Sequence, residues 1–255
     1  MAFPWIDAKI MMLTLRILTL CLLILRGVLT TALILPWCSR PRQQRLIREW
    51  SRSLLRSLGL TVSLHGTWPD TPGPFLLTSN HVSWMDIFVI HSIHPVRFVS
   101  KSEVRQWPVF GWLAAKTGTL FLTRESRRQT MEIGVSMINA LKQGDDLGLF
   151  PESTTSLGLT LLPFKTSLFQ APIDCAATLL PVALKYQIPP GAIESAYPFI
   201  GEMTFMESLI KVLQGPPTQV SLALGPPYPV NTLSTERRSL ALQLQHITQS
   251  LLDSI

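Results

Sequence analysis

The chain has 255 residues, of which 47% are hydrophobic and only 15% charged. The charged share lies well below the roughly 25% of an ordinary soluble domain, which excludes a disordered or highly solvated chain. Twenty prolines exclude one continuous helical bundle. We therefore expect one or two domains and a globular body with some membrane-facing surface.

The net charge of +6 is concentrated near the N-terminus. Residues 1–60 contain nine basic and two acidic side chains, a net charge of +7, whereas the other 195 residues contain 13 basic and 14 acidic ones, a net charge of −1. A nucleic-acid-binding domain more often spreads basic side chains over its folded surface. The segregation favours an anionic membrane surface, and not nucleic acid, as the partner.

An almost wholly apolar stretch runs from Ile10 to Leu35, and Arg16 and Arg26 are its only charges. Its charge-free windows, Ile17–Leu25 and Gly27–Pro36, are each shorter than the roughly 20 residues of a straight membrane span. An arginine near the interface can extend its charge to the headgroups. We expect a helix that dips into one leaflet, with a clean span and a buried core helix as alternatives.

The next stretch, Pro41–Leu58, has the pattern of a basic amphipathic helix that Gly59 ends. Its regularly spaced apolar residues and opposing arginines are Leu46, Trp50, Leu54, Leu58, Arg48, Arg52 and Arg56. The apolar face is expected to pack on the body, while the arginines face either solvent or lipid phosphates. We assign residues 1–58 to a membrane-associated helical segment and residues 59–255 to an α/β domain.

After Gly59, short apolar runs alternate with helical stretches, which predicts a mixed, largely buried sheet flanked by helices and preceded by an N-terminal helix pair. The expected strands are Thr61–His65, Phe75–Ser79, Arg97–Ser100, Gly118–Thr123, Leu147–Phe150, Leu180–Lys185 and Gln219–Leu224. The expected helices are Trp84–His91, Arg105–Lys116, Arg127–Gln143, Phe164–Ala171 and Ser234–Leu252.

The sharpest motif, Asn80 to Asp86, follows the strand expected at Phe75–Ser79. His81 in the strand-to-helix loop can contact Asp86 in the first helical turn, although on one ideal helix the two would lie ~140° apart. An aspartate that accepts from one imidazole nitrogen fixes the tautomer and leaves the other nitrogen as a base. A capping box with Ser83 as N-cap and Asp86 at the third helical position explains the same residues without chemistry.

Two further polar clusters follow expected strands. One places the carboxylate of Glu152 among hydroxyl groups after Leu147–Phe150, and the other ends the strand at Phe121 with Arg124. On their own, Glu152 and Arg124 are better explained by an ordinary surface ion pair.

Together and in this order, the clusters resemble the blocks of the glycerolipid (lysophospholipid) acyltransferase family, typified by 1-acylglycerol-3-phosphate acyltransferase. The resemblance covers roughly Thr61–Leu224. The matching residues are Asn80, His81 and Asp86 in N-H-x₄-D; Phe121 and Arg124 in the second block; Phe150, Pro151, Glu152, Thr154 and Ser156 in F-P-E-G-T-R-S; and Pro181–Val182 in the fourth.

The resemblance implies an enzyme that transfers a fatty acyl group from a thioester to the hydroxyl of a lysolipid. His81 would be the general base and Asp86 its orienting partner. Backbone N–H groups near the start of the Ser83 helix would stabilise the oxyanion. The expected substrate-binding residues are Arg124, Glu152, Ser153, Thr154, Thr155 and Lys165.

The resemblance also implies partners and a location. Acyl-CoA or acyl carrier protein would be the co-substrate and a membrane lipid the acceptor. We expect no metal and no other cofactor, because His81, His91 and His94 are not spaced as metal ligands. Three cysteines without a paired framework suit a reducing compartment. The protein is expected at the inner (cytoplasmic) membrane, with its active site facing the cytoplasm.

Two residues depart from the third block. Ser153 stands where the family has glycine, and Thr155 stands where it has an arginine implicated in holding the acceptor phosphate. With the following Leu162–Lys165, this pattern resembles a subgroup that includes lyso-ornithine lipid acyltransferases. We expect 1-acylglycerol-3-phosphate as acceptor. The alternatives are a phosphate-free lysolipid, a hydrolase or transacylase on the same scaffold, and a non-catalytic lipid-binding protein.

Overall fold

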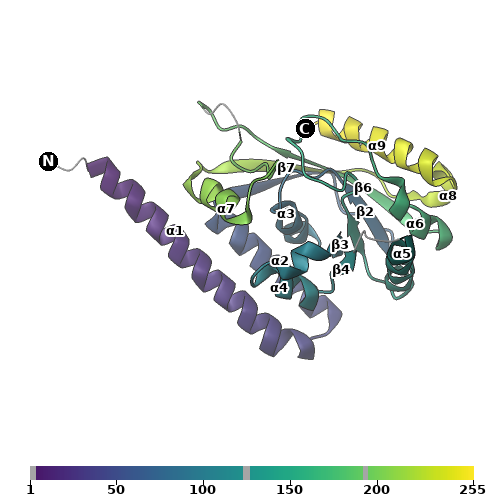
Figure 1. The fold of residues 1–255 in the computed structure, drawn as a ribbon, viewed down its shortest axis with the longest axis horizontal. Helices are drawn as coiled ribbons and strands as arrows, with labels where there is room; N and C mark the ends of the chain where they lie inside the picture. The colour runs from purple at the N-terminus through teal and green to yellow at the C-terminus, as the bar shows by residue number, and fades with distance from the viewer. Residues whose placement is uncertain (1–3, 123–126, 192–194) are drawn as a thin grey trace.

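The structure, a computed structural model, describes residues 4–122, 127–191 and 195–255 (Figure 1). Its centre is an eight-stranded sheet with the order β1-β7-β6-β2-β5-β3-β4, in which β8 also pairs with β6. The strands are β1 (Leu60–His65), β2 (Phe75–Ser79), β3 (Arg97–Lys101), β4 (Leu120–Leu122), β5 (Leu147–Leu149), β6 (Thr178–Tyr186), β7 (Thr218–Leu224) and β8 (Tyr228–Pro229). β6 runs antiparallel to β7 and β8, and the other pairs are parallel.

Helices cover both faces of this sheet (Figure 1). They are α1 (Pro4–Leu29), α2 (Arg40–Ser57), α3 (Asp86–Ile93), α4 (Phe110–Lys116), α5 (Arg127–Lys142), α6 (Gln170–Asp174), α7 (Phe205–Gln214), α8 (Val230–Leu233) and α9 (Arg237–Asp253). Along β2, Phe75 and Leu77 enter the core that includes α2 and α3, whereas Leu76 enters the core that includes α5 and α9. Burial on both faces explains why the central strands β2, β5 and β6 read as largely apolar runs, and the predicted fold class is confirmed.

Two helical predictions differ from the structure, and helix α7 was not predicted. The helix expected over Arg105–Lys116 is split into a 3₁₀ turn (Ser102–Gln106) and α4, because Pro108 and a left-handed Val109 (φ 63°) intervene. The helix expected over Phe164–Ala171 is a 3₁₀ turn (Thr166–Leu168) followed by α6. The sequence analysis also missed α7, whose N-terminus is closed by a capping box between Thr204 and Glu207.

One face of α1 packs on the body. The indole N–H of Trp50, on α2, donates to the carbonyl oxygen of Leu23 at 2.8 Å. Gly27 makes this approach possible, since a Cβ there would lie 2.6 Å from Nε1 of Trp50. Beyond α1, the chain continues through a π-helical segment (Thr30–Ile34) and a 3₁₀ turn (Leu35–Trp37) before α2. α1 is therefore docked on α2 and does not stand free.

Arg16 has a partner that the sequence analysis did not foresee. Its guanidinium donates to the carbonyl oxygens of Leu213 and Gly215, at 2.8 and 3.0 Å, where α7 ends. These carbonyls lack helical partners and carry the negative end of the helix dipole. The charge within the apolar stretch is thus satisfied by protein and does not depend on reaching a headgroup.

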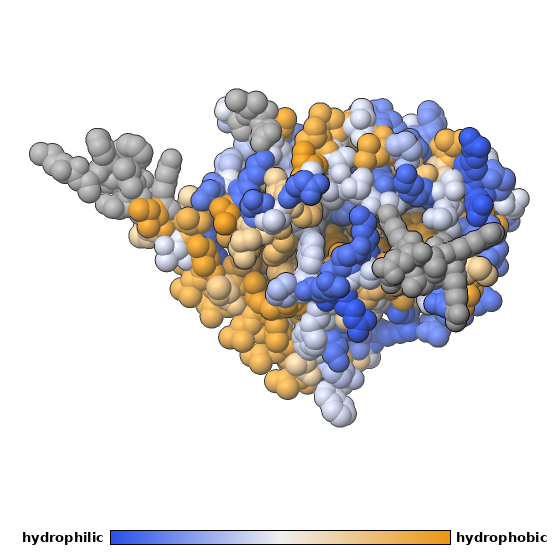
Figure 2. All heavy atoms as spheres, viewed as in Figure 1, coloured by the Kyte–Doolittle hydropathy of each residue, from blue (hydrophilic) through white to orange (hydrophobic). Residues whose placement is uncertain are grey.

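The opposite face of α1 is apolar and exposed (Figure 2). Its exposed side chains include Ile10, Met11, Met12, Leu15, Leu18, Leu22, Leu25 and Leu29. Ile10–Trp37 is the one helical stretch among the described residues that is long and apolar enough to cross a membrane. Only 17% of its most apolar window is buried, so the buried core helix is the wrong alternative.

Candidate active site

The loop that connects β2 to α3 is fixed to the neighbouring strand β6 by its first residue. The fully buried amide of Asn80 donates to the carbonyl oxygen of Leu184 at 2.9 Å and accepts from the Leu184 N–H at 2.7 Å. The side chain thus pairs with the backbone of β6 as a residue of a neighbouring strand would. It sets the position of His81 at the carboxyl end of β2, where open α/β sheets bind ligands.

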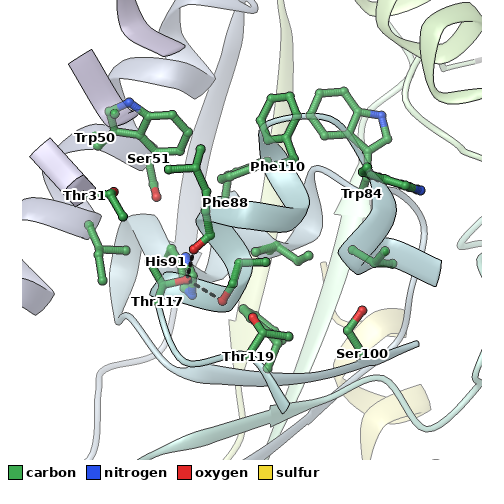
Figure 3. A pocket seen from close by; sticks show the side chains of 18 of the residues that line it. Thr31, Trp50, Ser51, Trp84, Phe88, His91, Ser100, Phe110, Thr117 and Thr119 are labelled. Carbon is green, nitrogen blue, oxygen red and sulfur yellow. Dashed lines mark hydrogen bonds between the residues drawn. The ribbon is translucent and has the colours of Figure 1, made fainter. Parts of the chain in front are cut away.

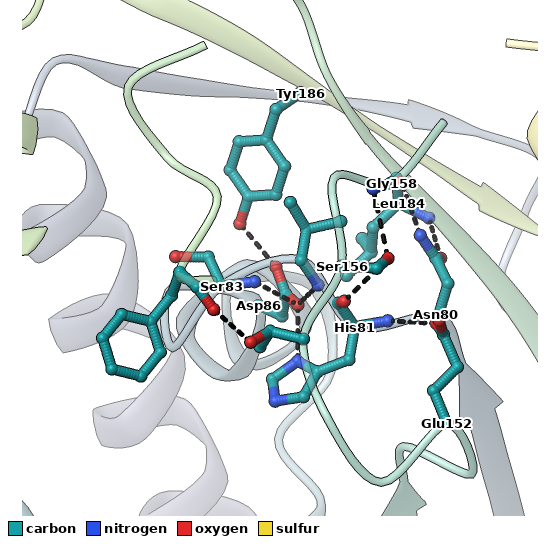
Figure 4. A network of polar contacts seen from close by, with 12 residues as sticks. Asn80, His81, Ser83, Asp86, Glu152, Ser156, Gly158, Leu184 and Tyr186 are labelled. Carbon is teal, nitrogen blue, oxygen red and sulfur yellow. Dashed lines mark hydrogen bonds and ion pairs between the residues drawn. The ribbon is translucent and has the colours of Figure 1, made fainter. Parts of the chain in front are cut away.

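His81 and Asp86 meet, as the loop position predicted (Figure 4). Nδ1 of His81 lies 2.8 Å from Oδ2 of Asp86, which is the first residue of α3 and fully buried. The same oxygen accepts the backbone N–H groups of Val82 (2.7 Å) and Ser83 (3.0 Å), and Oδ1 accepts the hydroxyl of Tyr186 (2.6 Å). Four donors hold the carboxylate in one orientation and compensate for its burial.

The structure does not contain the full capping box, with Ser83 as N-cap, that was the alternative explanation for Ser83 and Asp86. The N-cap of α3 is Met85, and it makes no side-chain capping bond. The hydroxyl of Ser83 is buried without a hydrogen-bond partner among the described residues. Because the N–H groups of Val82 and Ser83 are bound by Asp86, they are not free to stabilise an oxyanion, which corrects that expectation for these two groups.

The imidazole of His81 is also held from one side. It stacks on the ring of Phe150 with centroids 4.0 Å apart and planes 11° apart, and Phe150 stacks on Phe98 at 5.4 Å. The His81 side chain keeps 20% of its surface exposed, and no described residue bonds its Nε2. The arrangement offers one orientated, accessible nitrogen for proton transfer.

Glu152, which belongs to the F-P-E-G-T-R-S block of the sequence, binds the loop that carries His81. Its carboxylate is 2% exposed and accepts the backbone N–H groups of His81 (2.8 Å) and Leu162 (2.9 Å). Burial raises the pKa of Glu152, although the two hydrogen bonds oppose that shift. Glu152 is therefore not a surface residue, and Arg124, the other member of the ion pair considered for it, lies outside the described residues. Glu152 fixes two loops, and its part in substrate binding remains a prediction.

Four of the other predicted binding residues lie at or near the loop that carries Glu152. Ser153, which stands at the family's glycine position, has a left-handed backbone with φ 66°. Thr154 and Lys165 are exposed near this loop, and the N–H of Lys165 donates to the Pro151 carbonyl at 2.8 Å. The hydroxyl of Thr155 donates to the carbonyl oxygen of Phe199. Arg124 lies outside the described residues.

An apolar cavity of about 140 Å³ lies beside α3, between α2 and α4 (Figure 3). Aromatic side chains from all three helices and from their flanking segments line it, including Trp50, Trp84, Phe88 and Phe110. His91, also in the lining, is buried, and desolvation lowers its pKa to about 4, so it is neutral at physiological pH. The sequence could not place this cavity, because its walls come from segments far apart in the chain.

Comparisons with known proteins agree with this geometry. A family model described as Acyltransferase matches residues 61–185. The chain is 40% identical over 149 residues to a 1-acyl-sn-glycerol-3-phosphate acyltransferase of Neisseria meningitidis, which is 58% of this chain and 58% of that protein. It is 37% identical over 205 residues to a lyso-ornithine lipid O-acyltransferase of Pseudomonas aeruginosa, covering 80% of this chain and 77% of that protein.

A second lyso-ornithine lipid O-acyltransferase, from Brucella abortus, is 37% identical over 224 residues, with 83% of each chain covered. The crystal structure of the 1-acyl-sn-glycerophosphate acyltransferase PlsC from Thermotoga maritima superposes with a TM-score of 0.70 over 98% of this chain and 97% of that one. Its sequence identity is 17%, so this likeness concerns the fold. The chain spans a little over half the length of the Neisseria relatives and more than three quarters of these two lyso-ornithine enzymes.

Proposed function

The chain belongs to the glycerolipid (lysophospholipid) acyltransferase family, and from that premise we propose that it transfers a fatty acyl group from a thioester to the free hydroxyl of a lysolipid. The observation that carries the proposal is the pair of His81 and Asp86, 2.8 Å apart at the carboxyl end of β2. The Nδ1–H of the imidazole donates to a fully buried carboxylate, and Nε2 remains available as a base.

In the proposed reaction, His81 takes the proton of the acceptor hydroxyl as the oxygen attacks the thioester carbonyl carbon. The negative charge of Asp86 stabilises the imidazolium that forms. A carbon–oxygen bond forms, the carbon–sulfur bond breaks, and the leaving thiolate takes the proton back from His81. The thioester is already activated, so no covalent acyl-enzyme is required.

The acyl donor is proposed to be acyl-CoA or acyl carrier protein, with part of its chain in the apolar cavity beside α3. The segment that follows Asp86 leads directly into that cavity through Ile87 and Phe88. Burying methylene groups stabilises a bound chain by about 0.8 kcal/mol each. Ala114→Leu, which fills part of the lining, should shift the preferred donor to shorter chains. Ala115→Leu, the matched control outside the lining, should not, and equal preferences in all three proteins would contradict this placement.

For the acceptor, 1-acylglycerol-3-phosphate is the first candidate, as in the Neisseria relative's name. A phosphate-free lysolipid is the second candidate, and a specific observation favours it. Thr155 replaces the expected phosphate-binding arginine, and its hydroxyl already donates to Phe199. No charge is offered at that position. The two lyso-ornithine lipid enzymes that the chain matches over most of its length have names consistent with this second acceptor.

A panel of lysolipid acceptors with acyl-CoA and acyl carrier protein donors, read by product mass, tests the proposal. Formation of acylated lysolipid supports it, and absence of product with every acceptor would contradict it.

Variants at two positions test whether the acceptor carries a phosphate. If it does, Arg124→Ala should raise the KM for that acceptor by about 10- to 150-fold, the factor that corresponds to the loss of one charged hydrogen bond. Thr155→Arg should then help or leave the reaction unchanged, but impair a phosphate-free acceptor. Thr155→Ala separates the lost hydroxyl from the added charge.

The membrane is proposed to contact the exposed apolar face of α1, with that helix embedded in one leaflet. Because α1 is tied to α2 by Trp50 and to α7 by Arg16, a perpendicular span would draw the body into the bilayer. We propose an inner-membrane location with the site facing the cytoplasm. Resistance to 1 M salt, which shortens electrostatic screening to about 3 Å, supports insertion. Release of the protein by salt alone would contradict it.

A further inference from the structure

A buried tyrosine contacts Asp86 on the side away from His81 (Figure 4). Tyr186 is the last residue of β6 and 8% exposed, and its hydroxyl donates to Oδ1 of Asp86 at 2.6 Å. The other oxygen, Oδ2, already accepts from His81 and from two backbone N–H groups. Tyr186 is thus the one donor to Oδ1 within the described part of the chain.

The Tyr186 hydroxyl is a permanent donor in a fixed place. Burial, together with the negative charge of Asp86, raises the pKa of Tyr186 well above its ordinary value, so the hydroxyl keeps its proton at physiological pH. The ring stacks on the fully buried ring of Tyr197, with centroids 5.3 Å apart and planes 21° apart. A hydrogen bond from a fixed donor to a carboxylate is both stronger and more directional than one between neutral groups.

The same strand holds both ends of the Asn80–Asp86 segment. Asn80 exchanges two hydrogen bonds with the backbone of Leu184, and Asp86 accepts the side chain of Tyr186 two residues later on β6. The side chains of Leu184 and Tyr186 point to the same face of the sheet, because side chains alternate along a strand. β6 therefore sets the separation between the start of the loop and the carboxylate.

We propose that Tyr186 is a positioning residue for acyl transfer, which holds Oδ1 of Asp86 so that Oδ2 stays aligned with Nδ1 of His81. The proposal rests on the proposed catalytic roles of His81 and Asp86. Without the hydroxyl, Oδ1 is left buried with no described donor, and the carboxylate turns to recover hydrogen bonds at the expense of that alignment. The effect falls on kcat, because Tyr186 is buried behind Asp86.

Tyr186→Phe is the test variant and Tyr197→Phe its matched control. Each removes one buried hydroxyl and keeps both stacked rings, but only the first touches Asp86. With palmitoyl-CoA and either 1-acylglycerol-3-phosphate or lyso-ornithine lipid, Tyr186→Phe should lower kcat about ten-fold or more and keep each KM within about two-fold. Tyr197→Phe should retain kcat within about two-fold. A folded Tyr186→Phe protein with wild-type kcat, or equal losses in both variants, would overturn the proposal.

Proton NMR of the full chain supplies a readout that does not depend on turnover. The Nδ1 proton of His81 should resonate far downfield in the wild type, shift or broaden in Tyr186→Phe, and stay unchanged in Tyr197→Phe. An unchanged signal in Tyr186→Phe would overturn the proposal, whether or not the wild type is active. A wild type that acylates neither lysolipid would refute the proposed function, and the NMR comparison would still test the role of Tyr186. If Tyr186→Phe does not fold, the test is the rate at which the Tyr186 hydroxyl proton of the wild type exchanges with water. Slow exchange supports the hydrogen bond to Asp86, and fast exchange overturns it.

Discussion

Asp86→Asn should remove the charge beside His81 while leaving the loop in place. The backbone N–H groups of Val82 and Ser83 both donate to Oδ2, so the amide must present its oxygen there. That oxygen also faces Nδ1 of His81, and the imidazole therefore keeps its tautomer. The amide nitrogen faces Tyr186, whose hydroxyl can accept. We therefore expect Asp86→Asn to lose activity through the missing charge, whereas a wrong tautomer is the usual explanation for such a loss.

The size of the effect follows from the geometry. Oδ2 lies 2.8 Å from Nδ1, which places the two charge centres roughly 4 Å apart. At an effective dielectric constant of about 20, such charges attract by about 4 kcal/mol. The neutral amide recovers part of this through its hydrogen bond, so the transition state should lose about 2–4 kcal/mol, or about 30- to 1000-fold in kcat. Unfolding free energy should fall by about 1 kcal/mol, the net value of one hydrogen bond, because the amide keeps most of the contacts of the carboxylate.

The assay compares kcat, KM and thermal unfolding of Asp86→Asn with those of wild type. Asp174→Asn is the matched control, since Asp174 is an exposed carboxylate on α6, and it should behave as wild type. Two results would refute the reasoning: a folded Asp86→Asn protein with wild-type kcat, or a loss of more than about 3 kcal/mol of stability, which marks an uncompensated buried group.

Three further variants test other parts of the structure. Ser153→Gly should raise the unfolding free energy by up to about 1 kcal/mol, because glycine relieves the left-handed backbone; a lower melting temperature would contradict this. Gly27→Val should place a side chain against Trp50, cost about 1–3 kcal/mol and hasten proteolysis of α1, unlike Gly134→Ala, where nothing lies within 4 Å. His91, with its pKa lowered to about 4, takes up a proton more readily when unfolded, so stability should fall by up to about 1.4 kcal/mol per pH unit from about 6.5 down to about 4. The unfolding free energy of His91→Gln, measured with urea at several pH values, should fall less steeply between about pH 6.5 and about pH 4 than that of wild type. An equal dependence on pH would contradict the lowered pKa of His91.

The centre of the sheet was predictable because β2, β5 and β6 are buried on both faces and are bounded by turns. The approach of His81 to Asp86 was predictable because five positions across a strand-to-helix loop limit the geometry to few arrangements. α7 carried a usable signal, since Thr204 and Glu207 have capping-box spacing. That signal was missed beside the stronger periodicity of other helices.

Contacts between distant segments carried no such signal. Tyr186 reaches Asp86 only because β6 pairs with β2, and Arg16 meets the end of α7 only after α1 has docked. A single sequence gives no information about such pairs. The departures from the family pattern at Ser153 and Thr155 were visible in the sequence, but only the structure gives them a backbone angle and a hydrogen-bond partner.

The most direct test of the account compares acyl transfer by wild type, His81→Ala and His94→Ala. His94 is a matched control, because its Nε2 lies 2.7 Å from Asp146 and its side chain is 19% exposed, close to the 20% of His81. If His81 is the general base, His81→Ala should fold normally and lose about 10²- to 10⁴-fold in kcat, and folded His94→Ala should stay within about two-fold of wild type. A folded His81→Ala protein that acylates the lysolipid at the wild-type rate would contradict the account.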